Sequence, residues 1–263
     1  MAVPALVKLA HPRTNPIARK AAITALGRIG DRNISEHLLQ CIEEPTLAEP
    51  TALALLLLGD RRGVDFHGRA LAEGRRDLLG SPGEIVGRFG GPSHLPLLLA
   101  AADGDDQRAM GALHGLALLG DPRGIPALLA ALSSKNRKVI ECSNAGLHLL
   151  SGRDDDVNRP GFKHRWMTWH DQTGSQLEQG VRHREGRIFD LALLIKHMDY
   201  PDAWTRRTAY DELVIASGHT APFDAEGPWR VQQANLRAWK RWWQSNRQRF
   251  PAGHWHLHGA TIG

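Results

Sequence analysis

The chain has 263 residues, 42% of them hydrophobic, and a formal net charge of +5. This length suits one or two compact cores, or one elongated stack of about seven or eight helical hairpins. The charge is far below that of a dedicated nucleic-acid-binding tail. The sequence has no run of about 18 uncharged apolar residues, and its start, MAVPALVKLA, lacks the features of a signal peptide. We therefore expect neither export nor a membrane span.

The two cysteines, Cys41 and Cys142, lie far apart in apolar helical contexts. Such positions favour buried free thiols over a disulfide framework. We therefore expect a reducing, cytoplasmic location.

Apolar residues recur at helical spacing from the start of the chain. The predicted helices before residue 105 cover residues 3–9, 19–29, 34–42, 47–58, 63–73, 78–89 and 94–102. In the second of them the expected inward residues are Ala22, Ile23, Ala25, Leu26 and Ile29.

The most complete unit is residues 105–132, DDQRAMGALHGLALLGDPRGIPALLAAL. Both halves carry apolar residues on one side of a helical wheel, which predicts two antiparallel helices. Between them Gly120 suits a left-handed helix end, Asp121 an N-cap and Pro122 a first helical position. Such a hairpin cannot bury its apolar faces alone and needs neighbours on both sides.

Glycines mark the joints between hairpins. Gly30, Gly59, Gly90 and Gly120 are 29, 31 and 30 residues apart, each at the end of a predicted helix. A fifth copy of the helix that ends at such a joint, 139–150, ends in Ser151-Gly152. The constant spacing predicts a helical solenoid.

The motifs ALGRIGD at 25–31, LLLLGD at 55–60 and LALLGDPRGIPALLAAL at 116–132 resemble the HEAT-like repeats of bacterial proteins, first noticed in phycobilin lyases. The resemblance covers residues 1–150 and resumes at 187–217. It implies an α-α superhelix, and in that family an Asp and an Arg lie near the start of the second helix of each pair. The residues at that place here are Arg19, Arg108 and Arg206, with Asp106 and Asp202 just before two of them.

After Gly152 two segments follow one plan: a Ser-Gly helix end, a polar loop with acidic residues, and a helix with Trp-x-x-Trp. The first loop contains Asp154–Asp156, which we interpret as a solvated turn with a helix-capping role. Tryptophans three residues apart share a helix face. We expect them to cover the open apolar ends of the solenoid as structural caps. The cap residues are Trp166, Trp169, Trp239, Trp242 and Trp243.

Between the two caps an ordinary hairpin is predicted from helices 187–198 and 204–216. The C-terminal run is similar to the ends of HEAT-repeat proteins encoded in type VI secretion gene clusters. The matching residues are Trp239, Trp242, Trp243, Arg249, Phe250, Gly253 and Gly259. This resemblance implies an accessory or immunity-type role in a bacterial secretion system.

His254, His256 and His258 alternate along the tail and would share one face of a strand. Three imidazoles could hold Zn, Ni or Cu, but a metal site also needs a shaped cavity and second-shell acceptors. We interpret the segment as a polar tail packed by Trp255 and predict no metal and no cofactor. His164, His170 and Asp171 lack an accompanying nucleophile, so we assign no catalytic residue.

Arginine pairs recur near predicted turns, as does the run from Arg182 to Arg187. If the repeats bring them to one edge, they form a basic stripe for an acidic protein partner. The partner-binding candidates are Arg61, Arg62, Arg108, Arg206 and Arg207.

We predict an all-α, right-handed superhelical solenoid of HEAT-like hairpins. Residues 1–152 form the repeat array, and residues 153–263 continue it with the two caps and a tail. The expected function is a non-catalytic scaffold for a protein partner. One alternative is a DNA-binding protein similar to the alkylation-repeat DNA glycosylases, for which Trp169 with Asp171 and Trp204 with Asp202 are the residues to consider. Another is a chromophore lyase subunit.

Overall fold

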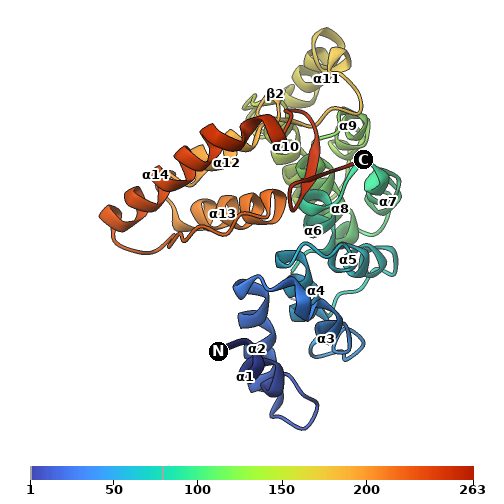
Figure 1. Ribbon diagram of the computed structural model, residues 1–263. Helices are drawn as coiled ribbons and strands as arrows, with labels where there is room; N and C mark the ends of the chain where they lie inside the picture. The colour runs from blue at the N-terminus through green and yellow to red at the C-terminus, as the bar shows by residue number, and fades with distance from the viewer. Residues whose placement is uncertain (1, 79) are drawn as a thin grey trace. The chain divides into compact units, whose positions relative to one another are not determined.

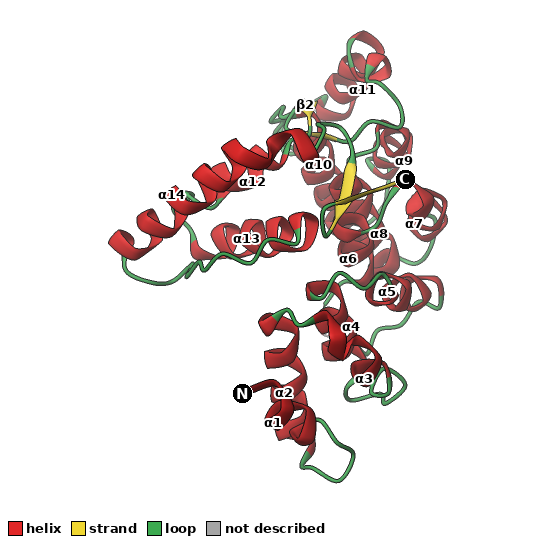
Figure 2. Ribbon diagram, viewed as in Figure 1, coloured by secondary structure: helices red, strands yellow, loops and turns green. Residues whose placement is uncertain are grey.

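The computed structural model describes residues 2–78 and 80–263. The described chain is mostly helical, with short strands only in the last third of its sequence (Figures 1 and 2). It divides into two compact units. The first contains residues up to 67, 194–242 and 257–260, and the second contains 68–193, 243–256 and 261–263. Both units are discontinuous in sequence, so they do not test the predicted division of the chain at residue 152. That division stays a prediction.

The helices of the first unit form packed pairs, in which α2 contacts α1 and α4, and α4 contacts α3 and α13. The boundary of this unit falls inside α5 and α12, and α14 extends four residues beyond it. The Tyr210 ring of α13 lies 5.9 Å from the Trp239 ring of α14, so these two helices are in contact. The helices are α1 (Ala2–Leu9), α2 (Pro16–Ile29), α3 (Ser35–Leu39), α4 (Ala48–Leu57), α5 (Arg62–Ala72), α12 (Leu191–His197), α13 (Ala203–Ser217) and α14 (Trp229–Asn246).

In the second unit α8 is the central helix, because α6, α7, α9 and α10 all pack against it. Its buried side is lined by alanines and leucines, and Ala112, Leu113 and Leu116 have no exposed surface. The helices are α6 (Pro82–Phe89), α7 (Leu95–Ala102), α8 (Asp106–Leu119), α9 (Ile125–Ala131), α10 (Arg137–Ser151) and α11 (Phe162–Gln172).

The turn after α8 contains the helix-ending glycine and the N-capping aspartate that the sequence predicts. Gly120 has a φ of 76° and its N–H donates to the Leu116 carbonyl, which ends the helix. The Asp121 carboxylate accepts the N–H of Arg123, and a 3₁₀ turn over Pro122–Gly124 leads into α9. Gly30, Gly59, Gly152 and Gly218 end their helices in the same left-handed conformation. Gly90 does not, because its backbone is extended, with φ −76° and ψ −178°.

Several predicted boundaries were wrong. The helix predicted from 78 begins at Pro82, since Ser81 caps it and proline takes its first position. The helix predicted over 34–42 is reduced to a 3₁₀ turn and α3. Ile29, expected to face inward, is 45% exposed.

The helix predicted from 187 begins only at Leu191, because the residues before it form a hairpin. Strands β1 (His183–Arg184) and β2 (Arg187–Ile188) pair around Glu185 and Gly186, both with positive φ. A second hairpin joins β3 (Trp255–Leu257) to β4 (Ala260–Ile262) through His258 and Gly259, with φ of 48° and 82°. Consecutive positive φ values are typical of the tightest hairpin turn.

Candidate functional site

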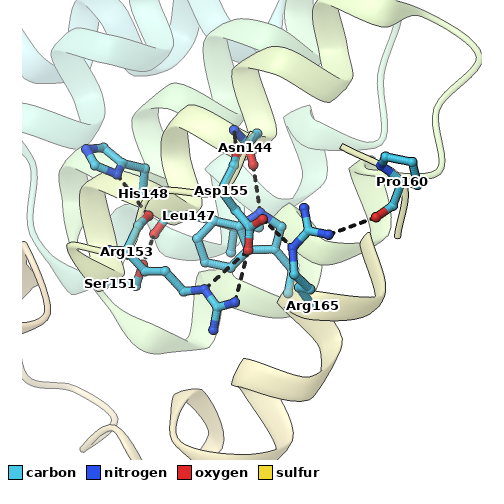
Figure 3. Close-up of polar contacts among 9 residues, drawn as sticks. Asn144, Leu147, His148, Ser151, Arg153, Asp155, Pro160 and Arg165 are labelled. Atoms are coloured by element: carbon cyan, nitrogen blue, oxygen red, sulfur yellow. Dashed lines mark hydrogen bonds and ion pairs between the residues drawn. The ribbon is translucent and has the colours of Figure 1, made fainter. Parts of the chain in front are cut away.

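The segment around Trp166 is held by one buried carboxylate. Asp155, 6% exposed, accepts hydrogen bonds from Arg153 at 3.0 Å and from Arg165 at 2.6 Å (Figure 3). Asn144 of α10 donates to the Asp155 carbonyl and accepts the indole N–H of Trp166 at 2.6 Å. The predicted solvated turn over Asp154–Asp156 is therefore wrong at its middle residue, because two arginines compensate that charge.

The two tryptophans of each Trp-x-x-Trp segment contact each other. Trp166 and Trp169 meet edge to face with ring centroids 5.5 Å apart, as do Trp239 and Trp242. Trp166 and Trp239 have no exposed surface. His219 stacks on Trp242 at 4.5 Å, and Trp243 lies 6.0 Å from Phe250. The C-terminal tryptophan-rich aromatic cluster is thus confirmed.

The three alternating histidines have separate partners. His254 is exposed and bonds the Ala252 carbonyl, whereas His256 is buried, bonds the Pro251 carbonyl and packs edge-on against Phe250. His258 bonds the Leu57 carbonyl and contacts Arg32. Burial lowers the pKa of both His256 and His258. Within residues 2–78 and 80–263, no three His, Cys, Asp or Glu side chains are grouped so as to hold a metal ion.

Two of the four residues considered for base recognition, Trp169 and Asp202, are buried or used to cap a helix. Trp169 is buried, and its neighbour Asp171 is 75% exposed and lies 3.6 Å from His170. Asp202 caps α13 by accepting the N–H of Thr205 at 2.7 Å, and that hydrogen bond lowers the pKa of its carboxyl. Trp204, by contrast, is 75% exposed.

The candidate arginines lie in different environments. Arg61 is exposed, Arg62 pairs with Asp60 and Glu36, and Arg207 pairs with Glu226. Arg206 is half-buried and donates to the carbonyls of Tyr200, Pro201 and Ala225 at 2.6–2.9 Å. Arg108 belongs to the other unit, so the structure does not test the predicted continuous stripe.

Two arginines predicted to lie on the surface are buried. Arg182 and Arg184 are 2% and 4% exposed, and their guanidinium groups lie 4.2 and 4.4 Å from the centre of the Phe189 ring. Both donate to the Leu118 carbonyl, near the end of α8. Helix C-termini leave carbonyls without intrahelical donors and attract cations. Nothing in the sequence between Arg182 and Arg187 indicates that two of its arginines are buried against the end of a helix.

The second unit also contains a cavity of about 400 Å³ between α5, α6, α8 and α10. Arg75, Arg76 and Arg108 contribute cationic groups to its lining, and Ser81 and Gln107 contribute neutral polar ones. Apolar lining comes from Ala70, Leu71, Pro82 and Met110. Arg108 is one of the predicted partner-binding residues, and Arg75-Arg76 is one of the arginine pairs that recur near predicted turns. The other lining residues share no spacing pattern.

The PBS lyase HEAT-like repeat model matches residues 18–44 and 109–134. The chain contains HEAT-like repeats. The first match covers most of α2 and all of α3, and the second covers most of α8 and all of α9. The predicted all-α fold of HEAT-like hairpins is confirmed. Neither matched segment includes the C-terminal run, so the likeness to secretion-cluster proteins gains no support.

An engineered protein, solved crystallographically by a structural genomics consortium, is similar over 90% of this chain and 94% of its own. The two sequences are 14% identical and the TM-score is 0.22. No curated protein matches the chain. In the part of the chain that the structure describes, every helix is too short or too polar to span a bilayer.

Proposed function

We propose that this HEAT-like repeat protein is a non-catalytic scaffold that binds a protein partner. The observation that carries the proposal is the exposure of three aromatic residues at one end of the α13–α14 pair. Trp204 is 75% exposed, Trp229 is 64% exposed and Tyr200 is 46% exposed. Tryptophan, tyrosine and arginine are the residue types enriched at the energetic centres of protein interfaces.

The segments that carry these three residues, which we call the aromatic end, are held together by Arg206. Its guanidinium group bonds the carbonyls of Tyr200 and Pro201 in the turn before α13 and that of Ala225 in the loop before α14. Gln233 of α14 also donates to Asp199 in the same turn. The aromatic end is therefore built on fixed backbone, which limits the entropy lost when a partner binds.

The aromatic end is tested by affinity capture from the native host, identification of the partner by mass spectrometry, and titration of the two purified proteins. Truncating two interface-centre tryptophans costs about 2 kcal/mol or more each. Because such costs are not additive, we expect at least the equivalent of one of them, so the double variant W204A/W229A should bind the partner at least about 30-fold more weakly. Ile17, 81% exposed on α2, supplies the matched control I17A, which should bind as wild type does. Equal affinities for all three proteins would contradict the proposal.

A gel-shift experiment with duplex DNA at low and moderate salt distinguishes the nucleic-acid alternative. Binding through phosphate contacts weakens steeply with salt. We expect no specific complex, because Trp169 is buried and the Asp202 carboxylate caps α13, so each Trp-Asp pair has one member that is not free to contact a base. A placement in a secretion system is tested by the identity of the captured partner.

A further inference from the structure

The cavity between α5, α6, α8 and α10 contains an arginine that the fold does not use. Arg108 is half-buried, with its stem against the backbone of Gly104 and near Gly74. Its Nε atom is shielded from solvent. Among the residues that the structure describes, no group accepts a hydrogen bond from this side chain, and no carboxylate pairs with it.

Arginines near the start of other helices are tied to their own units. Arg19 of α2 bonds Glu44 and the Ala10 carbonyl, and Arg165 of α11 bonds Asp155 and the Pro160 carbonyl. Arg206 of α13 bonds three carbonyls. Arg108 occupies a similar place in α8 yet faces a cavity. Its shielded Nε–H lacks an acceptor among the described residues, and the adjoining cavity gives a ligand room to supply one.

The other charges at the cavity are already balanced. Arg75 pairs with Asp77 at 2.6 Å and Arg76 with Asp105 at 3.1 Å. Burial lowers the pKa of His114 and raises that of the Cys142 thiol, so both are neutral near pH 7. The nearest charges to His114 are Glu84, at 3.9 Å, and Arg88, and these two pair with each other. One positive charge therefore remains, and it matches an anion of charge −1.

We infer that this cavity binds a carboxylate group attached to an apolar body. The carboxylate pairs with the Arg108 guanidinium, whose planar fork fits two oxygens. The apolar body lies against Ala70, Leu71, Pro82 and Met110, which line the same cavity. A volume of about 400 Å³ lies in the range of small-molecule pockets and exceeds what one carboxylate fills. The inference does not depend on the proposed scaffold function, since the aromatic end belongs to the other unit.

The carboxylate has two sources, a free organic acid or an acidic side chain flanked by apolar residues in a peptide. Nuclear magnetic resonance of the ¹⁵N-labelled full chain follows the Arg108 Nε–H signal, which the R108K variant assigns. The probes are hexanoate with hexanamide as its uncharged match, a blocked peptide with glutamate between two leucines with its glutamine match, and inorganic phosphate.

We expect saturable shifts of the Arg108 signal with hexanoate or the glutamate peptide and none with their amide matches. The acid that binds more tightly identifies the source of the carboxylate. R108Q should weaken that binding about tenfold or more, because a hydrogen-bonded charge pair is lost. No saturation at about 20 mM of either acid, well above a millimolar Kd, would overturn the inference. Tighter binding of phosphate would also overturn it.

Thermal unfolding separates a ligand-binding arginine from a structural one. R108Q should keep the Tm of the wild type, since no side-chain hydrogen bond or ion pair within the described chain is lost. R206Q should lower it by roughly 3 °C or more, because three carbonyls lose their donor. A fall in Tm for R108Q as large as that for R206Q would assign Arg108 to the fold and refute the inference.

Discussion

Arginines near helix starts show how the same residue type acquires different roles from its surroundings. Arg19 is 5% exposed and donates to both carboxylate oxygens of Glu44 at 2.6 Å, and to the Ala10 carbonyl. It thereby links α2 to the turn that precedes it and to the turn between α3 and α4. Arg108 has no such acceptors and faces a cavity. The difference depends on residues that are distant in sequence, such as Glu44.

The Arg19–Glu44 pair makes stability depend on pH. The hydrogen bond from Arg19 lowers the pKa of Glu44 below its ordinary value of 4.5. A carboxyl group with a lowered folded-state pKa stabilises the protein above its unfolded-state pKa, and that stability is lost as the pH falls through the folded-state pKa. We expect the Tm difference between wild type and E44Q to be constant between pH 7 and pH 5 and to shrink below pH 4.5.

The neighbouring variant E43Q is the matched control for that experiment. Glu43 is exposed, and neutralising an exposed carboxylate away from a specific contact changes stability by about 0.5 kcal/mol or less. Thermal unfolding by circular dichroism at pH 3, 4, 5 and 7 makes the measurement. A difference between wild type and E44Q that does not change over this range would mean that the pair is not coupled to folding.

At the scale of elements, the crossing of α6 and α8 depends on glycines that the repeat pattern did not select. Gly83 and Gly87 of α6 face Gly111 and Gly115 of α8. A Cβ atom on Gly87 would lie 2.0 Å from the Gly115 carbonyl oxygen, and one on Gly83 would lie 2.2 Å from that of Gly111. Because the obstacle is backbone, no side-chain rotation relieves it. Glycine therefore sets the distance between these two helices.

The variant G87A tests this close approach. Alanine is the better helix former, but the added methyl group must push two helices apart, and overpacking of this kind costs about 1–3 kcal/mol. We expect a lower free energy of unfolding in urea. G68A is the matched control in α5, since its Cβ would meet only the end of the Leu97 side chain at 3.5 Å. We expect G68A to match or exceed wild-type stability, and equal stabilities for G87A and G68A would refute the steric argument.

At the scale of the whole molecule, each compact unit contains one fully buried tryptophan of the Trp-x-x-Trp segments. Trp166 belongs to the second unit and Trp239 to the first. Their surroundings differ in one respect. The indole N–H of Trp166 donates to Asn144, whereas that of Trp239 is buried with no acceptor among the described residues.

We therefore expect unequal costs for the same substitution. W166F leaves the amide oxygen of Asn144 without its donor, which adds about 1–3 kcal/mol to the packing loss shared with W239F. The double variant should equal the sum of the two single variants within about 0.5 kcal/mol, since the residues belong to different units. Urea unfolding of all four proteins gives these values. Equal costs for the single variants, or a large deviation from additivity, would contradict this account.

The sequence by itself determined the repeated hairpin, because a hairpin depends on local interactions. The positions of apolar residues, the N-cap of Asp121 and the left-handed glycines at Gly30, Gly120 and Gly152 are all readable within one repeat. The spacing of the tryptophans also predicted that the two members of each pair share a helix face, since residues three apart do so.

Only the tertiary structure decided what the charged residues do. The sequence could not show that Arg206 has carbonyl acceptors while Arg108 has none, or that Arg182 and Arg184 are buried on Phe189. Nor could it show the cavity, whose lining comes from four helices. A helix forms from neighbours along the chain, whereas burial and the pairing of a charge depend on residues that folding brings from elsewhere.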